Sequence, residues 1–323
     1  MPLRRDHILL GDIGATNARF ALLTDGTLGP VRWFEVCEFA RFTDAVDTFV
    51  NGDGEQSSIA SAVLAVAGPV DGGRCALTNC PWTIDRAELR DALRLAEVHV
   101  VNDFQATALS LPHLEADDLC ALGGGRAVPD APMAVLGPGT GFGVACLVPG
   151  SQGPVVIASE GGHASLAAAS RREDAVIDHL RQEFGHVSAE RVISGSGLEN
   201  VYRAIAALDG VEPLPRNAAE ITKAALNGTC PTARAALDMF CAMLGSVAGN
   251  IALVFGVRGG VYIAGGIAPR IVDHLRRSEF RTRFEDKGRF RSYLEAIPSN
   301  VIAHSAATFI GLKSIAERAL GGA

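Results

Sequence analysis

Two short glycine-rich turns, each set between two apolar strands, constrain this chain more than any other feature. The first is GDIGATNARFALL (residues 11–23), which follows the apolar run at residues 8–10, and the second is VLGPGTGFGVACLV (residues 135–148). Apolar residues resume in a strand-like pattern after each turn, so each turn predicts a β-hairpin. The second turn is about two residues shorter, which makes the two hairpins similar in design without being a sequence repeat.

A glycine-rich turn after a strand is typical of phosphate binding, but the strand that follows here excludes two common forms. A Walker loop and a dinucleotide-binding loop both require a helix after the glycines, and neither motif occurs. In a hairpin, backbone N–H groups and the Thr16 hydroxyl can face phosphate oxygens, Asp12 can hold the water shell of Mg²⁺, and Arg19 can help to anchor charge. The alternative is an ordinary tight hairpin in which Asp12 caps its own turn.

The size and charge of the chain indicate small-molecule chemistry in two domains. Its 323 residues exceed one typical domain, and 29 basic against 36 acidic residues give a net charge of −7, which disfavours nucleic acid as a partner. The seven cysteines form no Cys-x-x-Cys pair, so we expect neither a disulfide framework nor structural zinc, and a cytoplasmic location.

Strand-like and helical stretches alternate in both halves of the chain, which predicts an α/β fold. Residues 84–95 and 104–111 are expected to be helical, and residues 112–132 a loop or linker. The charge-free residues 239–257 are long enough to span a bilayer, but their Gly, Ala, Ser and Asn content favours a buried helix and no membrane. The basic stretch 276–291 is expected to pack its phenylalanines and to solvate its arginines.

Polar residues with the chemistry of sugar phosphorylation follow these elements. Asn102 and Asp103 come directly after an apolar strand, where ligands of α/β sheets gather, so Asp103 is a candidate base for a hydroxyl proton. The same pair is equally suited to capping the helix that begins at Phe104. Glu160 and His163 flank a Gly-Gly turn that either contacts a sugar or is a surface loop.

Several segments, in order along nearly the whole chain, resemble the motifs of bacterial ATP-dependent glucokinases, in the hexokinase and actin-like ATPase superfamily. The two hairpins resemble the phosphate motifs of that family, VYIAGGIAPR (261–270) its adenosine motif and VVNDFQATA (100–108) its catalytic segment. SEGGHASL (159–166) and GHVSAERVISGSGLENVYRA (185–204) are similar to its sugar-binding segments, and FEDKGRF (284–290) belongs to the same pattern. Ala15 departs from it, since many relatives have glycine there.

The resemblance implies a fold, a domain layout and a set of site residues. The fold is α/β, with two ribonuclease-H-like (actin-like ATPase) domains flanking an interdomain cleft: a small domain of residues 1–113 plus 304–323 and a large one of residues 114–303. Asp103 is the implied catalytic base. The implied sugar contacts are Asn79, Asn102, Asp103, Glu160, His163 and Glu190. The implied ATP contacts are Gly11, Asp12, Ile13, Gly14, Ala15, Thr16, Asn17, Gly137, Gly139, Thr140, Gly141, Gly265 and Gly266. Asp12 is the implied Mg²⁺ residue, acting directly or through water.

The implied activity is that of a glucokinase, which transfers the γ-phosphoryl group of ATP to the 6-hydroxyl of D-glucose at the start of glycolytic glucose use. Mg²⁺ is the implied cofactor, and a homodimer the implied assembly. A sugar sensor without catalysis would have lost Asp103 or the phosphate turns, whereas a kinase for another hexose or an amino sugar would retain every motif quoted. An actin-like assembly ATPase would have no use for the three residues Glu160, His163 and Glu190.

Overall fold

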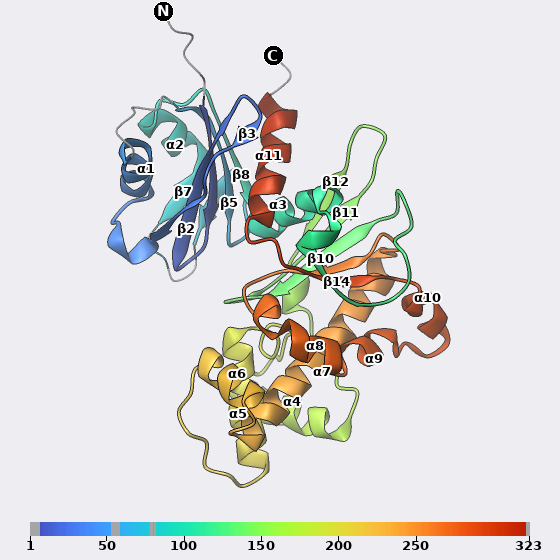
Figure 1. The fold of residues 1–323 in the computed structure, drawn as a ribbon. Coiled ribbons are helices and arrows are strands. Elements are labelled where there is room, and N and C mark those ends of the chain that lie inside the picture. Colours follow the sequence, from blue (N-terminus) through green and yellow to red (C-terminus); the bar gives the residue numbers. More distant parts are fainter. Residues whose placement is uncertain (1–6, 53–58, 78–79, 81, 321–323) are drawn as a thin grey trace, which may run out of the picture. The chain divides into compact units, whose positions relative to one another are not determined.

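The computed structural model describes residues 7–52, 59–77, 80 and 82–320. The chain divides into two compact units, one formed by Met1–Leu114 with His304–Ala323 and the other by Glu115–Ala303. We call them unit 1 and unit 2 and describe each by itself (Figure 1).

Unit 1 is built on a six-stranded sheet with the order β3-β2-β1-β5-β8, and β4 also pairs with β2. Strands β1 and β2 are antiparallel, whereas β1, β5 and β8 run parallel to one another. A separate two-stranded sheet is formed by β6 and β7. The strands are β1 (His7–Ile13), β2 (Asn17–Thr24), β3 (Thr27–Leu28), β4 (Arg32–Glu35), β5 (Ile59–Val66), β6 (Arg74–Ala76), β7 (Thr83–Asp85) and β8 (Glu97–Asn102).

Helices cover both faces of this sheet, which explains the continuous apolar run that begins β1. Leu9 and Ile13 pack in one core with residues of α1 and α2, whereas the intervening Leu10 packs in a second core with Phe309 of α11. Successive side chains of a strand point to opposite faces, so a strand covered on both sides is apolar throughout. The helices of unit 1 are α1 (Phe42–Asn51), α2 (Arg86–Ala92), α3 (Asp103–Ser110) and α11 (Ala307–Leu320).

Unit 2 repeats the same arrangement of strands. Its six-stranded sheet has the order β12-β11-β10-β13-β14-β9. Strands β12, β11 and β10 are successively antiparallel, β10, β13 and β14 run parallel, and β9 pairs antiparallel with β14. The strands are β9 (Leu119–Gly123), β10 (Met133–Pro138), β11 (Phe142–Val148), β12 (Val155–Ser159), β13 (Val261–Ile263) and β14 (Ser299–Ile302).

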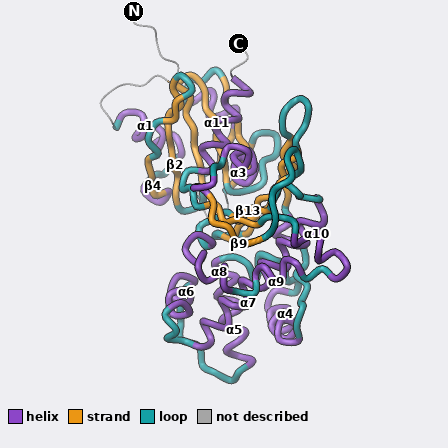
Figure 2. The backbone as a smooth tube through the Cα atoms, turned by 45° about the vertical axis from the view of Figure 1, so that its right-hand side comes forward, coloured by secondary structure: helices purple, strands orange, loops and turns teal. Residues whose placement is uncertain are grey.

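The helices of unit 2 form a layer beside its strands, which Figure 2 shows as purple tube next to the orange sheet. Their shared core contains Phe240 of α7, Phe280 and Phe284 of α9, and Leu136 of β10. The helices are α4 (Arg171–Phe184), α5 (Gly195–Leu208), α6 (Ala218–Leu226), α7 (Pro231–Phe255), α8 (Val272–Arg277), α9 (Phe280–Glu285) and α10 (Arg291–Glu295).

Helix α7 contains the charge-free stretch that was long enough to cross a membrane. It is the one candidate span among the described residues, and 72% of its most apolar window is buried inside the protein. Gly245 and Gly249 let the backbone of α9 approach closely, because a Cβ on either would lie 2.1 or 2.4 Å from a carbonyl oxygen of Phe280 or Phe284. The interpretation of this segment as a buried core helix is confirmed.

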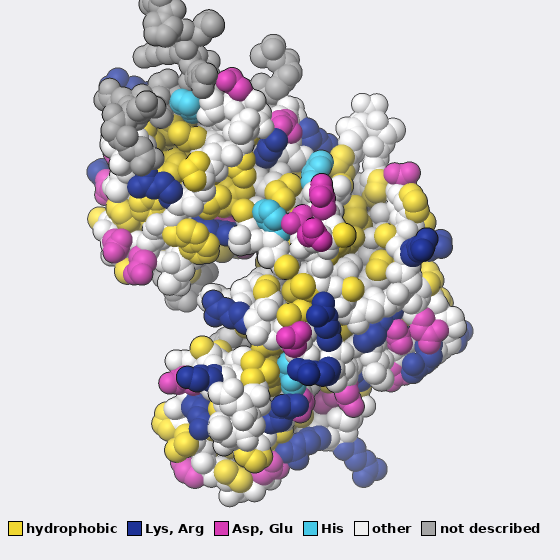
Figure 3. Space-filling view, in the orientation of Figure 1, with side chains coloured by type: hydrophobic (Ala, Val, Ile, Leu, Met, Phe, Trp, Pro, Cys, Tyr) yellow, Lys and Arg dark blue, Asp and Glu magenta, His cyan; other side chains and the backbone are white. Residues whose placement is uncertain are grey.

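The basic stretch 276–291 differs in part from expectation. Phe280 and Phe284 are fully buried as predicted, but Phe290 is 46% exposed. Arg281 and Arg283 are not solvated: their side chains are 16% and 11% exposed and make ion pairs with Glu285 and Glu173. These two arginines therefore serve folding, whereas the other arginines of the stretch are exposed as predicted, namely Arg276, Arg277, Arg289 and Arg291. Figure 3 shows basic side chains interspersed with acidic ones on the face that it draws.

Two expectations about secondary structure are wrong, one for a loop and one for the start of a helix. The predicted loop at 112–132 contains β9, whose short alternating pattern was too weak to identify and which depends on pairing with the distant β14. The helix expected at 84–95 begins at Arg86 instead, because Asp85 ends β7 and caps α2 by accepting hydrogen bonds from Ala87 N and Glu88 N.

Candidate active site

The first glycine turn joins β1 and β2 as an antiparallel hairpin, as the sequence predicts. Ile13 pairs with Ala18 in the strand register, and Gly14 N donates a 2.9 Å hydrogen bond to Asn17 O across the turn. Gly11 is closely packed, because a Cβ there would lie 2.7 Å from a methyl group of Leu64, which would have to move. The peptide groups of the turn are thus held in one conformation at the end of the sheet.

Asp12 lies opposite Arg19 in this hairpin, and their side chains form an ion pair. Arg19 Nε donates to Asp12 Oδ2 at 3.0 Å, and the same guanidinium donates to Ser305 O at 2.7 Å. It also lies 4.9 Å from the ring centre of Trp33. Arg19 is therefore fixed on several sides, and it holds the Asp12 carboxylate, whose side chain is only 14% exposed, in one place.

The first hairpin and the Asn102-Asp103 pair lie at the same edge of the unit 1 sheet. Ile13 is in register with Val66 of β5, and Val66 is in register with Asn102 of β8. The three parallel strands thus end side by side, which is where α/β sheets bind ligands. The carboxyl-end position that the sequence predicts for Asn102 and Asp103 is therefore observed, with the first hairpin at the same edge.

Asn102 caps α3, so one of the two alternatives for this pair is observed. Its Oδ1 accepts hydrogen bonds from Phe104 N and Gln105 N, and its Nδ2 donates to Gly68 O at 3.1 Å. A side-chain amide has a second N–H, so this arrangement still leaves Asn102 a donor for a ligand. Gly68 was not singled out from the sequence, although a glycine just after the apolar strand at 63–66 was a signal that could have found it.

Asp103 is the first residue of α3 and is half-buried. Its Oδ1 accepts a 2.9 Å hydrogen bond from Phe104 N at the helix N-terminus, an end that favours a negative charge. The carboxylate also acts on Cys75: burial raises the pKa of that thiol, and the charge of Asp103 raises it further. The cap at Asn102 and the carboxylate at Asp103 are therefore compatible roles of adjacent residues.

The second glycine turn is likewise an antiparallel hairpin, between β10 and β11. Gly137 pairs with Gly143, and the turn is closed by a 2.9 Å hydrogen bond from Gly139 N to Gly141 O. A neighbouring segment braces it, because Gly195 N at the start of α5 donates to Gly139 O at 2.9 Å. Thr140 lies at the exposed tip of this turn.

The segment after β13 packs directly against this second hairpin. Strands β10 and β13 pair in parallel, with Leu136 opposite Ile263. Gly265 has a φ of +85°, and a Cβ there would lie 2.4 Å from Pro138 O, so only glycine fits. Around Gly266, in contrast, a Cβ would meet nothing within 4 Å.

Three polar residues predicted to contact sugar come together in unit 2. His163 Nε2 lies 3.8 Å from Glu160 Oε2, and His163 Nδ1 lies 3.9 Å from Glu190 Oε1. Glu160 precedes a short 3₁₀ helix (Gly161–His163) that ends at His163, and the two side chains are 67% and 60% exposed. Gly162 is tightly packed, because a Cβ there would lie 2.0 Å from Phe142 O.

Glu190 connects this cluster to the second hairpin, a contact that sequence reasoning missed. Its Oε2 accepts a 2.8 Å hydrogen bond from Phe142 N, the first residue of β11. Gly141 is the adjoining residue of the turn, and a Cβ on it would lie 2.5 Å from the same oxygen. The glycine turn and the polar cluster therefore share one carboxylate within unit 2.

The predicted site residues are thus distributed over both units. Asp12, Thr16, Asn102 and Asp103 belong to unit 1, whereas the second hairpin and the Glu160, His163 and Glu190 cluster belong to unit 2. Asn79, the remaining predicted sugar contact, lies outside the described residues.

Comparisons with known proteins match the whole chain. The family model named Glucokinase matches residues 9–319. A glucokinase from Paramagnetospirillum magneticum is 46% identical over 311 residues, which cover 95% of this chain and 97% of that protein. A glucokinase from Pectobacterium atrosepticum is 41% identical over 98% of each chain.

Solved structures of glucokinases are similar in fold to this chain. The crystal structure of a glucokinase from an Antarctic psychrotroph has a TM-score of 0.86 at 37% identity and covers 97% of this chain and 99% of that one. A ROK family glucokinase from Streptomyces griseus, solved with glucose and AMPPNP, is similar in fold, with a TM-score of 0.65 at 18% identity over 97% and 99% of the two chains. The chain therefore belongs to the glucokinase family and is an enzyme that phosphorylates glucose with ATP.

Proposed function

We propose that Asp103 is the general base that accepts the proton of the 6-hydroxyl of glucose while that oxygen attacks the γ-phosphorus of ATP. The observation that supports it is the position of Asp103 at the carboxyl end of β8 and the first turn of α3. Phosphoryl transfer depends mainly on positioning and charge stabilisation, and a carboxylate that orients the hydroxyl contributes to both. Asn102 keeps the helix start, and with it Asp103, in place.

The two hairpins are proposed to hold the phosphates of ATP through backbone N–H groups. The residues proposed to contact ATP are 11–17 of the first hairpin and Gly137, Gly139, Thr140 and Gly141 of the second. The donors are the Thr16 and Thr140 hydroxyls and those N–H groups that are not already bonded across the turns, as the N–H groups of Gly14 and Gly139 are. Glycines allow phosphate oxygens to approach the backbone closely, and oriented N–H groups form anion-binding concavities. Gly265 and Gly266 are proposed to lie against the adenosine, since the space around Gly266 is open.

Asp12 is proposed to hold Mg²⁺ directly or through water. Mg²⁺ in phosphoryl-transfer sites takes one or two carboxylates and completes its shell with water and substrate phosphate, so a single fixed aspartate fits the ion. Arg19 contacts Oδ2 of Asp12 and keeps the carboxylate oriented. When bound, Mg²⁺ supplies charge neutralisation for the transferred phosphoryl group.

Glucose is proposed to be held by Asn102, Asp103, Glu160, His163 and Glu190, with Asn79 as a further contact. Sugar hydroxyls both donate and accept, and the clustered carboxylates, imidazole and amide offer matching partners. His163 lies 3.8 Å from Glu160 and 3.9 Å from Glu190, and this proximity supports a shared role for the three side chains.

Three broader properties complete the proposal. Both sheets contain three successive antiparallel strands followed by parallel ones, which supports two ribonuclease-H-like domains with bounds near residues 113 and 304. A cytoplasmic location is supported by the seven cysteines, which are all free. A homodimer is proposed from the family resemblance, and light scattering on the purified protein measures it.

The test of Asp103 is a pair of isosteric variants. Asp103→Asn retains an oxygen for the hydrogen bond from Phe104 N but removes the base, so we expect kcat to fall by roughly 10²–10⁴-fold while glucose binding is retained. Glu160→Gln should instead weaken glucose binding with a smaller effect on kcat. A coupled assay and glucose titration measure both quantities, and an Asp103→Asn enzyme with near-normal kcat would refute the assignment.

A further inference from the structure

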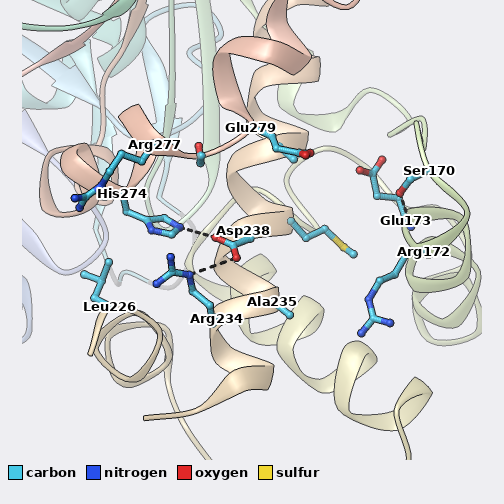
Figure 4. A pocket seen from close by; sticks show the side chains of 13 residues that line it. Ser170, Arg172, Glu173, Leu226, Arg234, Ala235, Asp238, His274, Arg277 and Glu279 are labelled. Carbon is cyan, nitrogen blue, oxygen red and sulfur yellow. Dashed lines mark hydrogen bonds and ion pairs between the residues drawn. The ribbon is translucent and has the colours of Figure 1, made fainter. Parts of the chain in front are cut away.

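A large pocket lies in unit 2, and it includes none of the residues proposed above to bind ATP or glucose. Its volume is about 900 Å³, which lies within the range of pockets that bind small molecules. Side chains from the start of α4, the end of α6, the first half of α7 and the region from α8 to α9 line it (Figure 4).

Most of the charged side chains that line the pocket already have partners. Arg172 pairs with Asp209 at 2.7 Å, and the buried Glu173 pairs with Arg283 at 2.6 Å. Arg234 Nε lies 3.3 Å from Asp238 Oδ2. These pairs orient the side chains of the pocket walls, but Arg234 retains N–H donors and Asp238 retains acceptor capacity beyond the contact between them.

Arg277 is a cation of the pocket that has N–H donors available for a ligand. Its Nε donates to Asp273 O of its own helix at 3.0 Å, and among the described residues it makes no ion pair. In Figure 4 the guanidinium groups of Arg277 and Arg234 lie on the same side of the pocket as the imidazole of His274. Two guanidinium groups on one side of a pocket are suited to a phosphoryl group, which Arg recognises through several N–H donors.

His274 is a buried polar side chain that lines this same part of the pocket. It is 6% exposed, and its Nε2 lies 2.8 Å from Asp238 Oδ1 but makes no hydrogen bond of acceptable angle. Burial lowers the pKa of His274, with the nearby Arg234 and Arg277 acting in the same direction against Asp238. His274 Nε2 is thus the buried polar atom of the described pocket lining that lacks an aligned hydrogen bond, although it lies beside Asp238.

We propose that this pocket binds a phosphorylated sugar or polyol, with its phosphoryl group between Arg277 and Arg234 and its hydroxyl groups toward Asp238 and Glu279. The two carboxylates disfavour a ligand that is anionic throughout, and they accept hydrogen bonds from hydroxyls. A ligand with one phosphoryl end and one hydroxylated end satisfies both parts of the pocket. Glucose 6-phosphate, the product of the enzyme, is one member of this class, so the pocket offers a route for feedback that rests on the glucokinase activity.

Binding is tested with the active site already filled. Isothermal titration of glucose 6-phosphate into the full-length protein, in saturating glucose and AMPPNP, should show one saturable site. Arg277→Gln should weaken this binding at least tenfold, whereas its basal kcat should be unchanged because Arg277 lies outside the proposed catalytic residues. Arg171→Gln is the matched control, since Arg171 is an exposed arginine of α4 that does not line the pocket, and it should bind normally.

Further ligands separate the parts of the proposal. Inorganic phosphate should bind more weakly than glucose 6-phosphate and should also depend on Arg277, and glycerol 3-phosphate should bind if the pocket serves the class rather than the product. If glycerol 3-phosphate does not bind, the proposed ligand class of phosphorylated sugars and polyols is wrong, and the pocket is restricted to the sugar phosphate. Absence of a saturable site, or equal affinity in the wild type and Arg277→Gln, would overturn the whole proposal, and phosphate binding as tightly as glucose 6-phosphate would overturn the role of the carboxylates. Active protein without binding would leave the glucokinase assignment standing.

Discussion

The two glycine hairpins are both antiparallel strand pairs joined by a short turn, but they carry charge in different ways. In the β1–β2 hairpin, the strands themselves supply an acid and a base, and Asp12 and Arg19 face each other across the ladder. In the β10–β11 hairpin, the residues from 133 to 148 include no charged side chain. The carboxylate beside it, from Glu190, comes from a distant segment and binds Phe142 N.

This difference indicates a division of labour. A hairpin with a fixed aspartate suits a metal and the charge that develops on phosphate, whereas an uncharged hairpin offers only N–H donors. The second hairpin is instead linked through Glu190 to the polar cluster proposed for glucose. We therefore expect substitutions in the first hairpin to act on metal and ATP, and substitutions in the second that displace Glu190 to act on glucose as well as on ATP.

Among the hairpin variants, the largest effect should come from Asp12→Asn. Loss of the carboxylate removes the proposed Mg²⁺ residue, and we expect kcat/KM for ATP to fall on the order of 10²–10³-fold, with a higher Mg²⁺ concentration needed for half-maximal rate. Asp25→Asn, which removes a charge at the exposed turn between β2 and β3, is the control and should be near normal. The comparison fails if Asp12→Asn retains its dependence on Mg²⁺ unchanged.

Next in size is Gly141→Ala, which should act on glucose. The new Cβ would lie 2.5 Å from Glu190 Oε2, so the flexible carboxylate must move and the bond from Phe142 N is disturbed, while the fold is kept. We expect KM for glucose to rise roughly 10- to 100-fold, since displacements near 1 Å carry effects of that order. Gly139→Ala places its Cβ in open space and should leave KM for glucose unchanged. Equal effects of the two variants on glucose would contradict the link through Glu190.

A smaller effect is expected from Arg19→Gln. This residue positions Asp12 and does not itself contact substrate in the proposal, so the Mg²⁺ requirement should rise about tenfold while the KM for glucose is unchanged. Loss of the charged hydrogen bonds to Asp12 and Ser305 should also lower the free energy of unfolding by about 1–3 kcal/mol. Arg19→Lys tests whether the role is positioning or purely structural. If it returns the Mg²⁺ requirement to the wild-type level while its free energy of unfolding stays as low as that of Arg19→Gln, Arg19 acts by positioning Asp12.

The hairpins also show how far the sequence could predict this protein. Glycines followed by an alternating apolar strand were sufficient to identify both hairpins, because turn chemistry and period are local properties. The bond between Glu190 and Phe142 was not predictable, since it joins residues 48 positions apart whose approach depends on the packing of Gly141 and Gly162. For the same reason β9 was missed, as it forms only when β14 is beside it.

The smallest effect is expected at Ala15, the residue at which many relatives have glycine. The described residues with positive φ other than glycine are Asp25, Arg94 and Asp130, so Ala15 adopts a conformation that alanine accepts without strain. Ala15→Gly should therefore leave KM for ATP within about threefold, and it should lower the free energy of unfolding by about 0.4–1 kcal/mol because glycine makes the unfolded chain more flexible. Denaturant unfolding and ATP kinetics measure the two quantities. A large gain in ATP affinity would instead mean that the Ala15 methyl group obstructs phosphate, and the first hairpin would then differ from the second in access as well as in charge.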